Sequence, residues 1–273
     1  MKKLTLHTVY LLIFVLCGAL VFTACSGRSQ SKAGEAAAPD ISEIINGTWM
    51  VSEIDDKPAL TNEKLVVSFA SGGKAYISTV YDAIPDDGAR WIDPAEASVS
   101  IDGSTVTITR PGSGNAALVD VLSISSITDT ETKGMLSVKS VEGSKETVIA
   151  EKPIALTRVN EDYREDILGL WEGRCTSDGS AFDDSQKHRW EYNADGTYLY
   201  YKTDGDGWNS STDPISEYFV AGKLLCTRWG TTDHEDREWW EITINGDSMN
   251  WTGLRKGEDG TTFTVTFEMT RVK

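Results

Sequence analysis

The chain repeats one pattern of motifs twice, and this repeat limits the possible folds more than any other feature. Residues 46–49 (Asn-Gly-Thr-Trp) open the first half, and residues 168–171 (Leu-Gly-Leu-Trp) open the second. Residues 156–159 (Leu-Thr-Arg-Val) close the first half, and residues 269–272 (Met-Thr-Arg-Val) close the second. Two copies are too few for a solenoid, in which each unit buries its apolar face against its neighbours. The repeat therefore predicts two tandem domains of one fold.

Each copy has the signals of β-strands joined by hairpins. Asp195-Gly196 supplies the positive φ that a tight hairpin turn requires. In the last segment Phe263, Val265 and Phe267 alternate with polar residues, as in a strand with one buried face. The strands expected in the first half are Thr48 to Ile54, Leu65 to Ala70, Lys74 to Val80, Ala97 to Ile101, Thr105 to Arg110, Leu118 to Ile127, Met135 to Ser140 and Pro153 to Val159. Those expected in the second are Leu170 to Cys175, Lys187 to Tyr192, Thr197 to Thr203, Glu217 to Val220, Lys223 to Trp229, Glu238 to Ile244, Asp247 to Trp251 and Thr261 to Val272.

The expected fold class is all-β, with two tandem small antiparallel up-and-down barrels of about eight strands each. The opening Gly-x-Trp and the closing Arg of each half resemble the lipocalin, or calycin, family, in particular the lipocalin-like domains of bacterial lipoproteins. That resemblance implies that an Arg packs across the Trp and closes the barrel, which pairs Trp49 with Arg158 and Trp171 with Arg271. Each copy is shorter than a lipocalin and lacks the family's Thr-Asp-Tyr motif and C-terminal helix. Two β-sandwiches therefore remain an alternative.

The N-terminus has the order of an export signal. Lys2 and Lys3 precede an apolar run from Val9 to Ala24, which ends at Cys25. Residues 21–25 (Val-Phe-Thr-Ala-Cys) resemble the bacterial lipobox, although Phe stands where an aliphatic residue is usual. The resemblance implies cleavage before Cys25 and acylation of its thiol, with palmitate for example. An ordinary secreted protein cut after Ala24 and an uncleaved anchor are the alternatives.

These segments predict four parts and a location. Residues 1–24 are the signal peptide, residues 25–40 a lipidated flexible tether, residues 41–160 the first barrel domain and residues 161–273 the second. The expected location is the bacterial cell envelope outside the cytoplasm. There the protein is lipid-anchored, with the outer membrane as the expected membrane.

The charge of the chain argues against nucleic acid as a partner. The whole chain has 26 Lys and Arg against 42 Asp and Glu, a net charge of −16, and loss of Lys2 and Lys3 with the signal makes it −18. A polyanion is repelled by such a protein, and no basic stripe interrupts the acidic background. The simplest role of the charge is solubility.

Of the four cysteines, Cys17 lies in the signal peptide and Cys25 is the expected lipid site, so Cys175 and Cys226 are the two left in the folded part of the exported protein. Two thiols in an oxidising compartment favour a disulfide between them. The bond would join the first expected strand of the second half to the fifth, on opposite sides of an eight-stranded barrel. It therefore requires a flattened barrel, or a Cys175 that lies in a loop over the barrel mouth.

No catalytic constellation is present, and no cofactor or metal is expected. His188 lies in an expected strand and His234 in an acidic loop, where sequence neighbours point in different directions and make a poor metal site. Residues 204–207 (Asp-Gly-Asp-Gly) resemble part of a calcium loop but lack the later Glu, so a hairpin turn is the better interpretation. Ser residues have no plausible His partner, so the protein is not expected to be an enzyme.

Aromatic residues are concentrated in the second half, which holds seven of the nine Trp. They could line a cup for a small apolar or aromatic ligand, or they could simply fill the core. The first hypothesis is capture of such a ligand in the second barrel. The second is an envelope or surface protein that binds another protein through filled barrels. The candidate ligand-binding residues are Trp190, Tyr192, Tyr198, Tyr200, Trp229, Trp240 and Trp251.

Overall fold

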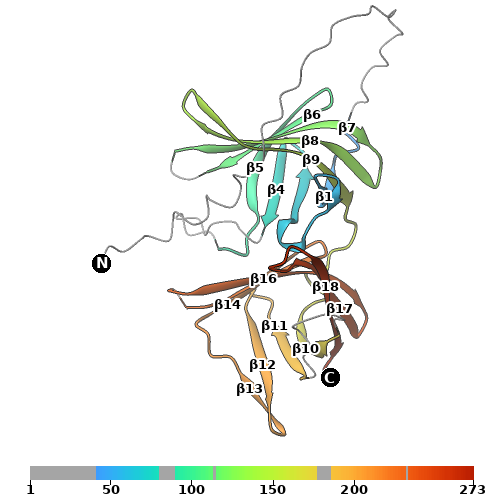
Figure 1. The fold of residues 1–273 in the computed structure, drawn as a ribbon, viewed down its shortest axis with the longest axis vertical. Coiled ribbons are helices and arrows are strands. Elements are labelled where there is room, and N and C mark those ends of the chain that lie inside the picture. Colours follow the sequence, from blue (N-terminus) through green and yellow to red (C-terminus); the bar gives the residue numbers. More distant parts are fainter. Residues whose placement is uncertain (1–40, 80–89, 113–114, 177–185, 232) are drawn as a thin grey trace, which may run out of the picture. The chain divides into compact units, whose positions relative to one another are not determined.

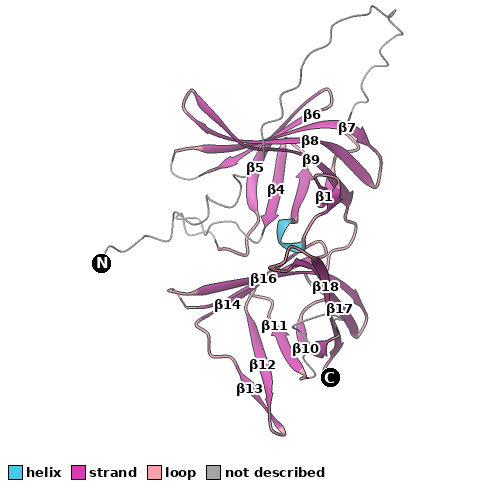
Figure 2. Cartoon of the chain, viewed as in Figure 1, coloured by secondary structure: helices cyan, strands magenta, loops and turns pink. Residues whose placement is uncertain are grey.

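The structure is a computed structural model that describes residues 41–79, 90–112, 115–176, 186–231 and 233–273. Apart from one short 3-10 helix, η2 (Thr61–Glu63), the secondary structure of these residues consists of β-strands (Figure 2). This confirms the all-β class. No helix in the described ranges has both the length and the apolar character needed to cross a membrane. The signal peptide, the tether and Cys25 all lie outside the described residues.

The first sheet closes on itself as an eight-stranded antiparallel barrel (Figure 1). Strand β1 pairs with β3 on one side and with β9 on the other, so the sheet has no free edge apart from the short β2. A closed sheet of this kind is a barrel and not a sandwich. The strands are β1 (Gly47–Ile54), β2 (Lys57–Pro58), β3 (Leu65–Ala70), β4 (Lys74–Thr79), β5 (Ala95–Asp102), β6 (Thr105–Pro111), β7 (Ala117–Ile127), β8 (Glu131–Glu142) and β9 (Lys145–Arg158).

The second sheet repeats this topology but does not close fully. Its order is β13-β12-β11-β10-β18-β17-β16-β15-β14, so β13 and β14 are its two edges. Its curl brings β12 and β14 together only at the bridge between Thr197 and Glu217. The strands are β10 (Gly169–Cys175), β11 (His188–Tyr192), β12 (Tyr198–Asp204), β13 (Gly207–Ser210), β14 (Ile215–Ala221), β15 (Leu224–Gly230), β16 (Glu235–Asn245), β17 (Ser248–Lys256) and β18 (Thr262–Arg271).

Glycine sets the tight turns at which neighbouring strands reverse. Gly222 joins β14 to β15 and Gly246 joins β16 to β17, each with a φ of 60°. A residue with a Cβ adopts this left-handed conformation only at a cost, so glycine favours the hairpin. Each of the two glycines therefore lies in the turn of a β-hairpin.

A matched Trp and Arg lie at the same end of each sheet. Trp49 is directly opposite Arg158 on neighbouring strands, and Trp171 is directly opposite Arg271. The guanidinium carbon of Arg158 lies 4.3 Å from the centroid of the Trp49 ring, and that of Arg271 lies 4.1 Å from the Trp171 ring. Both indoles are fully buried, and each donates its N–H to a carbonyl oxygen four residues earlier, at 2.7 Å.

The Arg side chains also explain the glycine of each Gly-x-Trp motif. Gly47 has a φ of 110°, and a Cβ there would lie 2.6 Å from Nη1 of Arg158. Gly169 has a φ of 106°, and its Cβ would lie 3.2 Å from Nη1 of Arg271. Glycine is needed at both positions because the backbone is left-handed and because the guanidinium occupies the adjacent space.

Three apolar clusters hold the described residues together. One fills the first barrel with mainly aliphatic side chains around Trp49, and a second fills the second sheet with mainly aromatic ones around Trp251. The third lies between outward-facing residues of the two sheets. Its members are Met50, Val66, Trp91, Val159, Phe219, Leu224 and Cys226.

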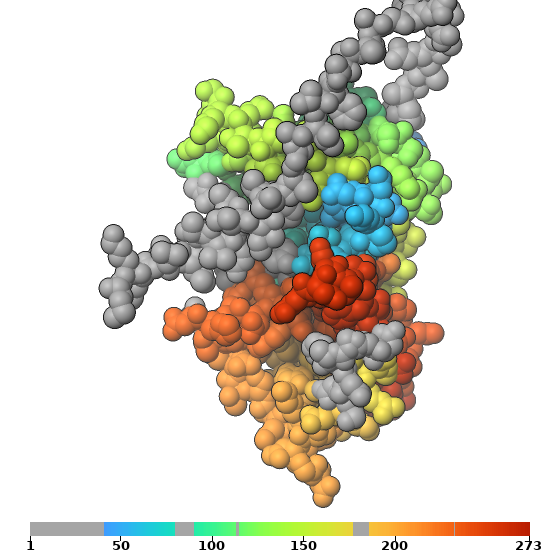
Figure 3. Space-filling view, in the orientation of Figure 1, coloured from blue at the N-terminus to red at the C-terminus, as the bar shows by residue number. Residues whose placement is uncertain are grey.

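The third cluster is reinforced by polar contacts between the two sheets. The Lys64 ammonium lies 2.5 Å from a carboxylate oxygen of Glu241. The amide of Leu254 donates to Oγ1 of Thr61 at 2.8 Å. Figure 3 shows the corresponding blue surface of the first sheet meeting the red surface of β17 and β18. Asp40–Lys273 accordingly form one compact unit.

The disulfide between Cys175 and Cys226 is not present, so that prediction was wrong. Both sulfurs are buried thiols. Cys175, on β10, belongs to the aromatic cluster inside the second sheet, whereas Cys226, on β15, belongs to the cluster between the sheets. Strands β18, β17 and β16 separate β10 from β15, so the two thiols lie on different faces of distant strands.

Candidate functional site

The inner face of the second sheet carries all seven candidate ligand-binding residues, and the structure divides them into two groups. Tyr192, Tyr198, Trp240 and Trp251 are between 1% and 5% exposed and belong to the packed core. Trp190, Tyr200 and Trp229 are only partly buried and pack against that core. We call the first group the lower tier and the second group the upper tier.

The lower tier is filled by contacts between rings. The Trp240 and Trp251 ring centroids are 5.5 Å apart, and Phe267 lies within 5.6 Å of both. The Tyr192 ring meets the Tyr218 ring edge-on at 4.7 Å. These are the separations of well-packed aromatic pairs. A ligand could contact the lower tier only by displacing side chains of the core.

The upper tier is partly open and has polar neighbours. The Trp190 ring lies 5.2 Å from the Tyr200 ring and 4.7 Å from the buried Trp251 ring. Nδ1 of His188 lies 2.7 Å from the Tyr200 hydroxyl, and the His188 ring stacks on the Tyr200 ring at 5.8 Å. The buried His188 therefore holds Tyr200 in one orientation.

A carboxyl group lies on the same inner face, beside the upper tier. Glu238 stands directly opposite Thr227 on β15 and two residues before Trp240 on β16, so all three face inward. Desolvation raises the pKa of the Glu238 carboxyl, and the positive charge of Arg255 offsets only part of the rise. The Trp240 N–H lies near the carboxylate without making a hydrogen bond of good geometry.

Arg255 interacts both with the Glu238 carboxyl and with the rings of Trp239 and Trp240. Its guanidinium carbon lies 4.5 Å from the centroid of the Trp240 ring and 4.9 Å from that of Trp239. Its Nη2 donates to the Trp239 carbonyl oxygen at 3.0 Å. The inner face thus combines aromatic rings with a carboxyl group and a guanidinium group, an arrangement suited to holding a planar ligand by stacking and by hydrogen bonds.

Three buried polar atoms of the lower tier make no hydrogen bond within the described residues. They are the Tyr192 hydroxyl, Nε1 of Trp240 and Nε1 of Trp251. Burial also raises the pKa of the Tyr192 hydroxyl well above its ordinary value. Buried donors without acceptors are uncommon in native proteins, and ordered water often binds such groups.

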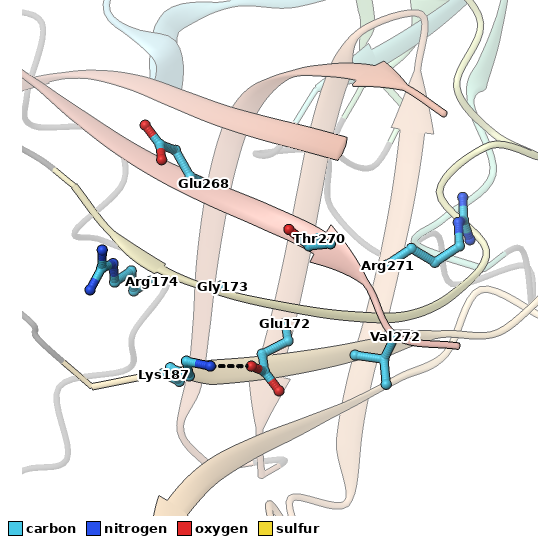
Figure 4. A pocket seen from close by; sticks show the side chains of 8 residues that line it. All are labelled: Glu172, Gly173, Arg174, Lys187, Glu268, Thr270, Arg271 and Val272. Carbon is cyan, nitrogen blue, oxygen red and sulfur yellow. Dashed lines mark hydrogen bonds and ion pairs between the residues drawn. The ribbon is translucent and has the colours of Figure 1, made fainter. Parts of the chain in front are cut away.

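A hollow lies on the outer face of β10 and β18 (Figure 4). It is open, has a volume of about 570 Å³ and is lined mainly by polar side chains. Glu172 in its wall is bonded to Lys187 at 2.7 Å and to Arg189 at 2.8 Å, and these contacts lower the pKa of Glu172. Because its main carboxylate is already paired, this hollow is a weaker candidate than the inner face.

Glu238 and Arg255 were not among the site residues predicted from the sequence, and His188 was assessed there only as a possible metal ligand. The signal for Glu238 was present, because residues 238, 240 and 242 share one face of a strand whose other members are Trp and Ile. Among the described residues, no three His, Cys, Asp or Glu side chains form a group that could hold a metal ion.

Comparison with known proteins does not assign a family. No protein-family model and no curated protein matches the chain. A protein of unknown function from the DUF3598 family of Nostoc punctiforme PCC 73102 is similar over 88% of this chain and 100% of its own, with 9% identity and a TM-score of 0.23. Two mutant structures of the vaccine antigen Transferrin Binding Protein B from Haemophilus parasuis Hp5 are also similar.

The double mutant of that antigen is similar over 83% of this chain, with 12% identity and a TM-score of 0.24. The single mutant is similar over 80%, with 6% identity and a TM-score of 0.23. This chain spans 45% of the first of these structures and 62% of the second. Scores of this size carry no argument about function, so the fold rests on the strand pairing described above.

Proposed function

We propose that this protein is a binding protein, without catalytic activity, that holds a small planar or aromatic ligand at the upper tier of the second sheet. The observation that carries the proposal is the partial exposure of Trp190, Tyr200 and Trp229 above a fully packed aromatic layer. Large aromatic side chains left accessible on the inner face of a curled sheet are typical of a ligand site. Glu238 and Arg255 would fix the orientation of a ligand with polar edges.

The location that we propose for this activity comes from the sequence. The basic start, the apolar run and Cys25 support a lipid-anchored protein on the extracytoplasmic side of a bacterial membrane. The negative charge of the exported body supports a soluble domain that does not bind nucleic acid.

Ligand binding can be tested with the neutral aromatic probe N-phenyl-1-naphthylamine and with native mass spectrometry of protein purified from its own host. The expected results are saturable fluorescence of the probe and a co-purified small molecule. Trp229→Ala should weaken probe binding by about 1 to 3 kcal/mol, or roughly 5- to 150-fold, because a stacking partner is lost.

Trp208→Ala is the matched control. Trp208 lies on β13 and stacks on Arg189, whose guanidinium carbon is 4.1 Å from the indole centroid, on the outer face of the sheet. The control should bind the probe as the unmodified protein does. Equal binding by the Trp229 variant, or no binding by any form, would refute the proposal.

A second function has support from a different observation. The filled lower tier and the filled first barrel suit a rigid platform that binds another envelope protein. Val148 and Ile149, on β9, are 56% and 51% exposed and offer an apolar contact. If Ile149→Asp loses a partner that co-purifies with the unmodified protein, while no small molecule is found, the platform is the better explanation.

A further inference from the structure

In the second sheet, β12 and β14 are incompletely paired, whereas the corresponding strands of the first sheet are fully paired. We call the junction between β12 and β14 the seam. In the first sheet, β4 and β5 pair at four positions, from Lys74 opposite Ser98 to Ile77 opposite Ala95. In the second sheet the corresponding strands, β12 and β14, share one isolated bridge, between Thr197 and Glu217. This bridge includes the hydrogen bond from the Tyr218 amide to the carbonyl oxygen of Gly196 at 2.9 Å, and the Tyr218 hydroxyl adds a bond to the carbonyl oxygen of Asn193 at 2.8 Å. Beyond these two contacts β12 pairs with β13 and leaves β14 as an edge.

Three residues from the first half of the chain contact both sides of this seam. On the β12 side, Nη2 of Arg90 donates to the carbonyl oxygen of Asp195 at 2.6 Å. Ile92 packs against Gly196 so closely that a Cβ on this glycine would lie 2.3 Å from Cδ1 of Ile92. Arg90 and Ile92 therefore hold the turn that leads into β12.

On the β14 side, Trp91 fits into a socket on the outer face of the second sheet. Its ring lies 4.9 Å from the Phe219 ring and is only 3% exposed. The guanidinium carbons of Arg228 and Arg237 lie 5.4 Å and 5.5 Å from the Trp91 centroid.

The socket is itself fixed by ion pairs. The Arg228 guanidinium lies 2.6 Å from a carboxylate oxygen of Glu217 and 3.1 Å from one of Glu235. Glu217 is also the bridge residue of β14. Trp91 is therefore joined through Arg228 to the residue at which the seam is paired.

We infer that Arg90–Ile92 is a staple that holds β12 against β14, and that the seam under it is the route by which a ligand reaches the aromatic inner face. The second clause rests on the proposed function, whereas the first does not. Tyr198 and Tyr218 follow the two bridge residues directly and belong to the aromatic core. Beyond the bridge, Tyr200 is the next inward residue of β12, and Trp229 stands opposite Ser216 of β14. Opening the seam would therefore widen access to these two members of the upper tier.

Native-state hydrogen exchange of the full-length protein tests the staple without any ligand. Trp91→Ala removes the contact on the β14 side, and Arg90→Ala removes the bond to Asp195 on the β12 side. In both variants the Tyr218 amide should exchange at least about tenfold faster, because the strand pairing that protects it opens more often. Amides of β17, such as that of Trp251, should keep their exchange rates.

Trp208→Ala is again the matched control and should leave the Tyr218 amide unchanged. If the Tyr218 amide keeps its rate in both staple variants, or if its rate rises only as much as that of Trp251, the staple is refuted. Arg90→Ala removes a single exposed hydrogen bond and should stay folded, so it still tests the staple if Trp91→Ala unfolds the whole protein.

A cross-seam disulfide tests the route. Thr197 and Glu217 stand directly opposite each other, so Thr197→Cys with Glu217→Cys places two thiols across the seam. Association of N-phenyl-1-naphthylamine should be at least about tenfold slower in the oxidised form than in the reduced form. Equal association rates would overturn the route but leave the staple, whereas absence of binding in both forms would overturn the proposed function.

Discussion

The Arg at the end of each sheet offers a prediction with a built-in comparison. Arg158 donates to three carbonyl oxygens, of Asp129 at 2.5 Å, Asn46 at 2.6 Å and Ile44 at 2.5 Å. Arg271 donates to two, those of Leu168 and Asp166. Each Arg also lies over its Trp at nearly the same distance. Nε of Arg271 also lies 3.7 Å from a carboxylate oxygen of the exposed Asp247. Replacing the two residues in turn therefore compares three carbonyl bonds with two carbonyl bonds and one exposed ion pair, while the cation–π contact stays similar, and an exposed ion pair contributes little to stability.

The expected losses follow from these contacts. A cation–π contact contributes about 0.5 to 2 kcal/mol. A hydrogen bond to a charged group contributes about 1.5 to 3 kcal/mol, less where water can replace the lost donor. We expect Arg271→Ala to cost about 2 to 4 kcal/mol and Arg158→Ala to cost roughly 1 kcal/mol more. Trp171→Ala should cost about 3 to 5 kcal/mol, because it also leaves a cavity.

The assay is urea unfolding of residues 41–273 followed by circular dichroism, with a double-mutant cycle on Trp171 and Arg271. Because the two side chains are in contact, their losses should not add, and the coupling free energy should exceed about 0.5 kcal/mol. Additive losses would refute the contact. A smaller loss for Arg158→Ala than for Arg271→Ala would show that the third carbonyl bond of Arg158 contributes less than the ion pair between Arg271 and Asp247.

Three further predictions concern other parts of the chain. Cys25→Ala should move the protein from the membrane fraction to the soluble fraction, as a cell fractionation immunoblot would show; retention on membranes with the signal uncleaved contradicts acylation. The denatured, unreduced protein should give two titratable thiols, those of Cys175 and Cys226, in a colorimetric thiol assay, and none would contradict the buried thiols of the structure. Residues 166–273 expressed alone should fold but be several kcal/mol less stable to urea, because Phe219, Leu224 and Cys226 lose their cover. Stability equal to that of the second sheet in residues 41–273 would mean that the third cluster contributes little.

The positions of the strands were predicted well from alternating apolar residues and turn residues. Two short strands, β2 and β13, were not predicted, for physical reasons. All eight expected strands of each half correspond to strands of the structure. Strand β2 has only two residues, and β13 carries a single apolar side chain, that of Trp208, so neither has an alternating pattern. The extra hairpin of β13 takes the edge of β12, and this explains why the second sheet stays open where the first sheet closes.

The contact between the two sheets is indicated in the sequence by continuous apolar runs rather than by alternation of apolar and polar residues. Tyr218, Phe219 and Val220 form a continuous apolar run, as do Leu224, Leu225 and Cys226. A strand with two buried faces has such a run, because residues on both sides avoid water. Here one face packs inside the sheet and the other in the third cluster. Which surface covers the second face depends on the arrangement of distant segments, and periodicity alone does not contain that information.

Glu238 gives a last prediction, in which stability and the candidate site are linked. Its pKa is raised in the folded protein, mainly by desolvation, with a smaller contribution from Asp236, and is lowered in part by Arg255 and Trp240. Between the ordinary carboxyl pKa and the raised one, the folded state binds more protons than the unfolded state. Stability therefore falls as pH rises through this window, and above it the full penalty remains.

Glu238→Gln removes the charge while keeping the size of the side chain. The variant should be more stable than the unmodified protein at neutral pH, and the difference should vanish below the ordinary carboxyl value of 4.5. Arg255 retains its bond to the Trp239 carbonyl and its stacking on Trp240, so it does not become an isolated charge. Urea unfolding at a series of pH values measures the effect. A variant that is less stable at neutral pH would show that attraction to Arg255 outweighs desolvation, and Glu238 would then be a structural partner of Arg255 rather than a group held ready for a ligand.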